Sequence, residues 1–153
     1  MIDARYLKTK TIHECSTGDL IVANPHHSGT LVGLVAECAG EKGVISFGSA
    51  SEIGFSFRPN SDTQTRYLVL EDWDVQVDPD SISSPFRSEY QPGNLAVSEN
   101  QFYFAVSHRY SIQFIGLDGG QKKAASADFI FTNWKILAGS KEARFQFWPF
   151  EHT

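Results

Sequence analysis

The chain has 153 residues and a formal net charge of −5, and 41% of its residues are hydrophobic. That is enough apolar material for one packed core. The acidic balance, without a block of lysine and arginine, excludes the usual nucleic-acid and anionic-membrane binders, because both classes bind through a basic face. A basic protein, a cation or a neutral ligand stays open as a partner.

The chain shows no apolar run typical of a secretion signal or a transmembrane helix. Its two cysteines, Cys15 and Cys38, can form one disulfide at most. We expect two reduced thiols, with at least Cys38 buried, as is usual inside cells. The sequence therefore predicts a soluble, cytoplasmic protein.

Apolar and polar side chains alternate along most of the chain, which predicts short strands. In chain order we expect strands over 19–23, 30–39, 43–47, 53–57, 67–70, 72–78, 102–108, 111–115, 128–137 and 143–147. Turn residues separate them, among them Asp118-Gly119-Gly120, while 121–127 can form one helical turn at most. The pattern favours an all-β fold with little helix, an antiparallel sandwich or partly open barrel of about nine to eleven strands.

The stretch 78–94 is the least regular, with three prolines and four serines. We expect a long loop within one domain over 1–153. The alternative is a linker between two small β units, 1–77 and 95–153, each of which would have a marginal core. Because long loops often carry function, this segment is a candidate binding element.

The alternation over 72–78 places Trp73, Val75 and Val77 inward and acidic side chains outward. Such a face is either a solvated edge or a binding surface for a basic partner. With the adjacent loop it gives the candidate partner-binding residues Asp72, Asp74, Asp78, Asp80, Arg87 and Tyr90.

Aromatic residues on strands whose other face carries phenylalanine form a second candidate surface. Flat aromatic faces suit sugar stacking, although core packing is the competing explanation. The candidate ligand-binding residues are Tyr103, Tyr110, Trp134 and Trp148.

Metal and catalytic motifs are weak, and we expect no catalytic residue, resident metal or cofactor. His13 and Cys15 would share one face of a strand, and both residue types ligate zinc. Adjacent His26 and His27 fit a polar turn between two strands better than a site. The nucleophile and phosphate-binding motifs of known enzyme classes are absent.

Two segments resemble SH3-like, β-rich immunity proteins of bacterial toxin systems. The first is "STGDLIVANPHHSGTLVGLVAE", and the second is the strand "NWKILAG" near the C-terminus. The matching residues are Gly18, Asp19, Gly33, Val35, Trp134, Lys135 and Gly139. The resemblance implies a bacterial protein that binds and neutralises a cognate toxin.

Three functions follow from these observations. The first is a non-enzymatic domain that recognises a protein partner, an immunity protein being one version. The second is a small-molecule or carbohydrate-binding β-module. The third is a metal-dependent, cupin-like enzyme built on histidines and a cysteine, with His108 added to the four candidate ligands. The sequence sets no oligomeric state.

Overall fold

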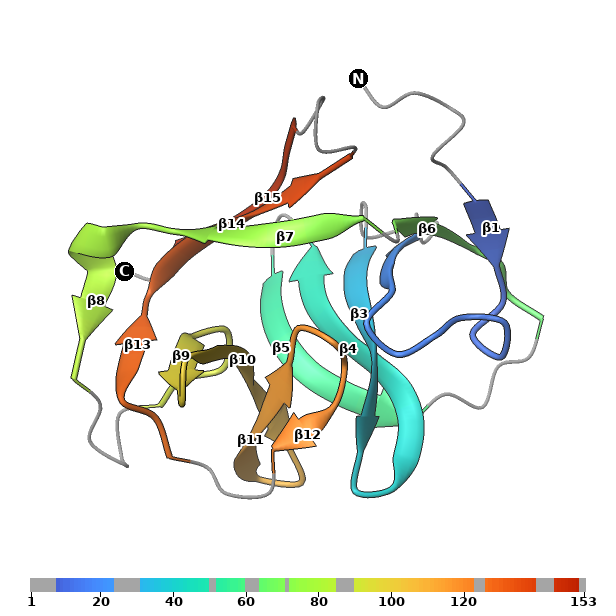
Figure 1. The fold of residues 1–153 in the computed structure, drawn as a ribbon. Helices are drawn as coiled ribbons and strands as arrows, with labels where there is room; N and C mark the ends of the chain where they lie inside the picture. Colours follow the sequence, from blue (N-terminus) through green and yellow to red (C-terminus); the bar gives the residue numbers. More distant parts are fainter. Residues whose placement is uncertain are drawn as a thin grey trace.

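The fold was analysed in a computed structural model, which describes residues 8–23, 31–49, 52–59, 64–70, 72–84, 90–122, 126–139 and 145–151. These residues form fifteen strands and one short 3-10 helix, η2 (Pro79–Ser81), and they include no α-helix (Figure 1). The prediction of an all-β fold is confirmed.

Twelve strands form one large, strongly curved sheet. Along it lie β1, β6, β2, β3, β4, β5, β10, β9, β13 and β8, and the strand pair β11–β12 joins at β10. The N-terminal strands are β1 (Lys8–Lys10), β2 (Leu20–Ala23), β3 (Leu31–Cys38), β4 (Glu41–Ser49), β5 (Glu52–Pro59) and β6 (Tyr67–Leu70). The later strands are β8 (Ile82–Ser83), β9 (Leu95–Ser98), β10 (Gln101–His108), β11 (Ser111–Gly116), β12 (Gln121–Lys122) and β13 (Phe129–Phe131).

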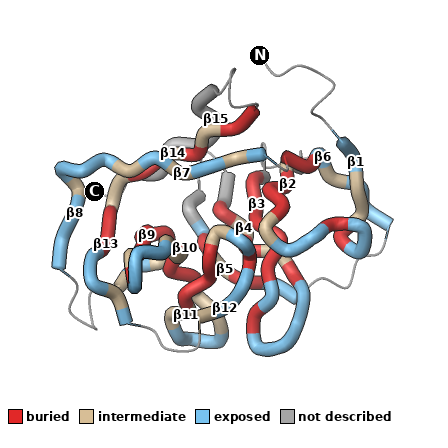
Figure 2. Tube along the Cα trace, in the orientation of Figure 1, coloured by how far each residue is buried: buried red, intermediate tan, exposed pale blue. Residues whose placement is uncertain are grey.

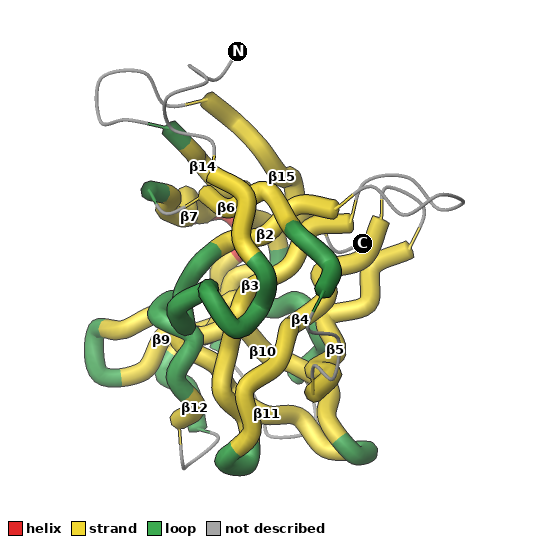
Figure 3. Tube along the Cα trace, turned by 90° about the vertical axis from the view of Figure 1, so that its right-hand side faces the viewer, coloured by secondary structure: helices red, strands yellow, loops and turns green. Residues whose placement is uncertain are grey.

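The remaining strands, β7 (Trp73–Val77), β14 (Asn133–Ala138) and β15 (Phe145–Glu151), form a second sheet in the order β15-β14-β7. This small sheet lies across the large one, and the turned view shows its strands together above β9, β10 and β11 (Figure 3). The two layers make a sandwich-like fold in which neither sheet closes into a barrel.

Two predicted elements differ from the observed ones. The strand expected over 128–137 is two strands, because the chain leaves the large sheet after Phe131 and enters the small sheet at Asn133. The helical turn expected from Gln121 onward begins instead as strand β12, which pairs with β11. Very short strands such as β8 and β12 carry no alternation, so the strand number exceeds the predicted one.

The main core lies between the two sheets. Trp134, on β14, is 3% exposed and packs against Phe47, Phe55 and Phe104, with ring centroids 6.3, 5.7 and 5.2 Å away. The same cluster includes residues that precede and residues that follow the 78–94 segment, the first being Leu20 and the last Ala138. Most of its side chains come from the faces that the alternation predicts to be apolar, whereas Trp134 was expected on an exposed face.

Buried residues lie along the strands of the large sheet (Figure 2), and two clusters of side chains cover its outer side. Ile12 and Cys15 cover Ile21, Val35 and Val69 on β2, β3 and β6. A third cluster covers β9, β10, β11 and β13 and consists of Ala96, Ala105, Phe114 and Ile130, with Tyr90 packed against them. Several central strands are therefore apolar on both faces, as the sequence predicts.

The segment 78–94 is more structured than the long loop expected for it. It contains η2, capped by the Asp78 carboxylate, and the strand β8, which pairs with β13. Its far end is held by the Trp134 indole, whose Nε1 donates to the Gly93 carbonyl at 2.8 Å. Within the described residues, these contacts attach the segment to both sheets.

Three two-residue turns connect neighbouring strands, at Ala39–Gly40, Glu99–Asn100 and Arg109–Tyr110. In each turn both residues have positive φ, which defines the type I′ turn that matches the twist of paired strands. Tyr110 is fully exposed at φ 65°, in a conformation that disfavours residues with a Cβ.

We expect Tyr110→Gly to raise the free energy of unfolding by about 0.5–1 kcal/mol, because glycine takes positive φ without steric cost. Urea denaturation checks this. Ser107→Gly, placed inside strand β10, is the matched control and should lower the stability. A decrease for Tyr110→Gly would contradict the turn assignment.

Candidate functional site

An acidic surface runs along β7, as the alternation predicts. Trp73, Val75 and Val77 point to the core, and the alternating residues are exposed. We define the acidic face by the exposed residues Asp72, Asp74, Gln76, Asp78 and Asp80. Because the core fixes every second side chain, the carboxylates are held in a row on one side of the sheet.

Among the described residues, the strand register brings one cation to the acidic face. It is Lys135 on β14, which lies opposite Gln76. Asp72, Asp78 and Asp80 form no ion pair with any residue in the described ranges. The carboxylates therefore leave a negative local potential.

β7 is an edge strand of the small sheet as described, with β14 as its neighbour. The Asp72 carbonyl accepts a hydrogen bond from the Gly139 amide, and the Asp78 amide donates one to the Asn133 carbonyl. The amides of Trp73, Val75 and Val77 therefore point away from β14. One of these outward amides, that of Val75, donates to the Asp74 carboxylate at 2.8 Å. The edge is thus partly closed to a further strand.

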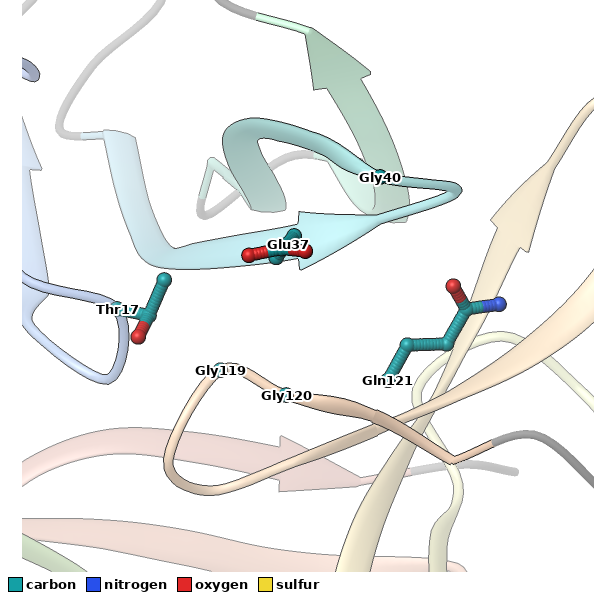
Figure 4. Close-up of a pocket in the computed structure, with 6 residues that line it drawn as sticks. All are labelled: Thr17, Glu37, Gly40, Gly119, Gly120 and Gln121. Carbon is teal, nitrogen blue, oxygen red and sulfur yellow. The ribbon is translucent and has the colours of Figure 1, made fainter.

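A cavity of about 480 Å³ opens beside the turn between β11 and β12 (Figure 4). We call it the hairpin cavity, and its lining residues are Thr17, Glu37, Gly40, Gly119, Gly120 and Gln121. The Glu37 carboxylate, the Thr17 hydroxyl and the Gln121 amide border this space. Its walls can exchange hydrogen bonds with a polar molecule, and none of these six lining residues has a large apolar side chain.

The hairpin is fixed by backbone contacts with β3. The Glu37 amide donates to the Gly119 carbonyl at 2.8 Å, and the Ala39 amide donates to the Gln121 side chain at 2.8 Å. A Cβ at Gly119 would lie 2.5 Å from the Val35 carbonyl oxygen, so only glycine fits there. The Asp-Gly-Gly turn predicted from the sequence is confirmed, but the pattern did not indicate that a cavity lies beside it.

The predicted ligand-binding aromatic residues do not share one surface. Trp134 was expected on an exposed face and is instead a core residue, because β14 turns that face towards the large sheet. Tyr110 stands exposed at a turn, and Tyr103 lies half-buried on β10, stacked on Phe114. The Trp148 side chain lies outside the described residues.

The predicted metal ligands do not assemble in the described part of the chain, where no three His, Cys, Asp or Glu side chains gather. The prediction that His13 and Cys15 share a strand face is wrong, because residues 12–14 form a turn. His13 is exposed in this turn, and Cys15, which follows it, is buried. His108 packs edge-on against Phe57 with its Nε2 buried and without a described partner. His26 and His27 lie outside the described residues.

Tyr90, one of the loop residues predicted to bind a partner, packs against the large sheet. Its ring packs against Phe114, and its hydroxyl oxygen accepts from the Ala127 amide at 3.1 Å. Arg87 lies outside the described residues.

Both cysteines are buried and free, on opposite faces of the large sheet. Burial raises the pKa of the Cys15 thiol, with a further rise from the Asp19 carboxylate, and neighbouring Lys10 and Lys42 oppose it. Burial likewise raises the pKa of Cys38, against the opposing charge of Arg109. Neither thiol has the electropositive, accessible setting of a reactive cysteine.

Comparison with known proteins finds no matching family model, no matching curated protein and no matching solved structure. Among the described residues no helix combines the length and the apolar character needed to cross a membrane.

We expect the stability of the wild-type protein to fall between pH 7 and pH 9.5 more than that of Cys15→Ala/Cys38→Ala. In the unfolded chain the thiols ionise above about pH 8.5, whereas the folded protein keeps them protonated because their pKa is raised. The unfolded state then binds fewer protons, so alkaline pH favours it. Urea midpoints at both pH values test this, and an equal fall in both proteins would contradict it.

Proposed function

We propose that the protein is a non-enzymatic binding domain that recognises a basic segment of a protein partner through the acidic face. The observation that carries the proposal is the row of exposed carboxylates on β7 and at both of its ends, of which Asp72, Asp78 and Asp80 form no ion pair with any described residue. Attraction between such a row and a basic surface speeds encounter and sets orientation.

Side chains, rather than added backbone pairing, provide the recognition in this proposal. The Asp74 carboxylate already accepts from the Val75 amide, which a strand added at this edge would need. Asp78 likewise uses one carboxylate oxygen to accept from the Asp80 amide, leaving the other for a partner. The partner's lysine or arginine side chains would therefore meet carboxylate oxygens along β7.

A toxin-neutralising immunity protein is one version of this function, and the toxin would then present the basic surface. Three of the residues that carry the resemblance to that family contribute to the fold. Gly18 and Asp19 form the turn that opens β2, with the Ser16 amide donating to the Asp19 carboxylate at 2.9 Å. Trp134 anchors the small sheet.

The test uses a labelled ten-residue peptide of alternating lysine and serine, with a glutamate counterpart, measured by fluorescence anisotropy. We expect Asp72→Asn/Asp74→Asn/Asp78→Asn to weaken binding of the lysine peptide about tenfold, from roughly 0.5 kcal/mol for each exposed charge. Asparagine keeps the oxygen that accepts from the backbone at positions 74 and 78. Binding of the wild type should weaken as salt rises.

The control variant Glu14→Gln/Glu41→Gln/Glu99→Gln removes the same number of exposed charges away from β7. It should change the affinity less than twofold. Equal weakening by both triple variants would show a net-charge effect and overturn the proposal. A peptide N-methylated at alternate amides should bind unchanged, whereas loss of its binding would indicate strand addition.

A further inference from the structure

A second cavity, of about 400 Å³, lies where the β11–β12 hairpin borders the start of β10. We call it the Lys122 cavity. Its walls combine amide, charged and apolar side chains, and it shares Gly120 and Gln121 with the hairpin cavity. Its lining residues are Gln101, Phe102, Tyr103, Gly116, Leu117, Asp118, Gly120, Gln121 and Lys122.

The cationic group of this cavity is held in place from two sides. The Lys122 ammonium donates to the Ser98 hydroxyl, and Ser98 is only 5% exposed. The same ammonium lies 5.2 Å from the centre of the Tyr103 ring, as a cation–π contact. An ammonium has three donors, so two fixed partners orient the group and leave hydrogen-bonding capacity for a ligand.

The anionic group is Asp118, held by the turn itself. Its Oδ1 accepts from the Gly120 amide at 2.9 Å, which fixes the carboxylate beside the cavity. Asp118 and Lys122 line the same cavity, and no ion pair joins them. The cavity is thus bordered by one cationic and one anionic side chain, each held by its own contacts.

Gly116 leaves room for the Asp118 carboxylate beside the cavity. It lies on β11 opposite Tyr103 of β10. A Cβ there would lie 2.8 Å from Asp118 Oδ1. Phe102 and Leu117 also line this cavity, and both are partly buried against the main core.

We infer that the Lys122 cavity binds a small zwitterion, of which a free α-amino acid is the simplest. The ligand's carboxylate would face the Lys122 ammonium, and its ammonium would face the Asp118 carboxylate. A dianion would be repelled by Asp118 and a simple cation by Lys122. A sugar would have to displace the Lys122 ammonium to stack on that face of Tyr103.

The probes are L-leucine, 4-methylpentanoate and 3-methylbutylamine, which have the same carbon skeleton beside the charges and carry both charges, the carboxylate alone and the ammonium alone. Amide shifts in two-dimensional NMR spectra of the full chain are followed up to about 20 mM ligand, a range that reveals millimolar affinities. We expect L-leucine to bind at least tenfold more tightly than either analogue, with the largest shifts at Gly116, Gly120 and Lys122.

Substitutions at Asp118 and at Lys122 test the contribution of each charge separately. Asp118→Asn keeps an oxygen to accept from Gly120 and should abolish the preference of L-leucine over 4-methylpentanoate. Lys122→Met should abolish its preference over 3-methylbutylamine, and Lys122→Arg should retain it. The matched controls, Asp128→Asn and Lys135→Gln, lie outside the lining residues and should leave all three affinities unchanged.

Equal shifts for the three probes, no saturable shifts with any of them, or shifts away from this cavity would overturn the inference. A response to glucose in place of the zwitterion would overturn it in favour of a carbohydrate site. Spectra of each variant without ligand show whether it is folded, so a lost response in a folded variant is a binding result. The acidic face takes no part, and the proposed protein partner stands or fails separately.

Discussion

The packing of Trp134 against three phenylalanines of the large sheet is the contact on which the rest of the structure depends. It is the point at which the small sheet meets Phe47, Phe55 and Phe104, and the indole also binds the Gly93 carbonyl. Truncating a buried tryptophan typically costs about 3–5 kcal/mol, a large part of the stability of a domain this size. Without this contact β14 would not pack on the large sheet. β7, which pairs with β14, would then lose its position as well.

The acidic face and the Lys122 cavity belong to different sheets, but backbone contacts at Gly18 set the distance between them. The Trp73 indole of β7 donates to the Gly18 carbonyl at 2.8 Å. Gly18 also donates to the Val35 carbonyl, and its Cα lies against the backbone of Asp118. A glycine is required there, because its φ is 93° and a Cβ would lie 3.0 Å from the Asp118 carbonyl oxygen. One turn thus fixes β7 and the β11–β12 hairpin against β3.

Alternation predicted which residues share a face, and this was sufficient for the acidic face and for most of the core. Trp73, Val75 and Val77 point inward as expected, and so do Phe104 and Val106. Alternation does not say which face another layer covers. Trp134 was therefore assigned to a ligand surface although β14 buries it, because its strand belongs to the second sheet.

The cavities escaped the sequence analysis for a related reason. Residues of the Lys122 cavity meet through the pairing of β10, β11 and β12, and β12 has two residues and no readable pattern. Gly119 is required because of its contacts with Val35, Gly18 and Thr17, which are distant in sequence, and composition cannot show such contacts. His13 and Cys15 were misplaced because a turn over 12–14 breaks the strand that their spacing implied.

The order of strands in the small sheet has a consequence for biosynthesis. β7 ends at Val77, but its neighbour β14 begins only at Asn133, so a growing chain carries one edge of β7 unpaired while the intervening residues are added. At about 5–20 residues per second this interval lasts several seconds on the ribosome. Carboxylates between the apolar side chains, one of them bonded to the Val75 amide, discourage pairing with another nascent chain during that time. The same charges that face solvent in the finished protein therefore protect the chain while it is being made.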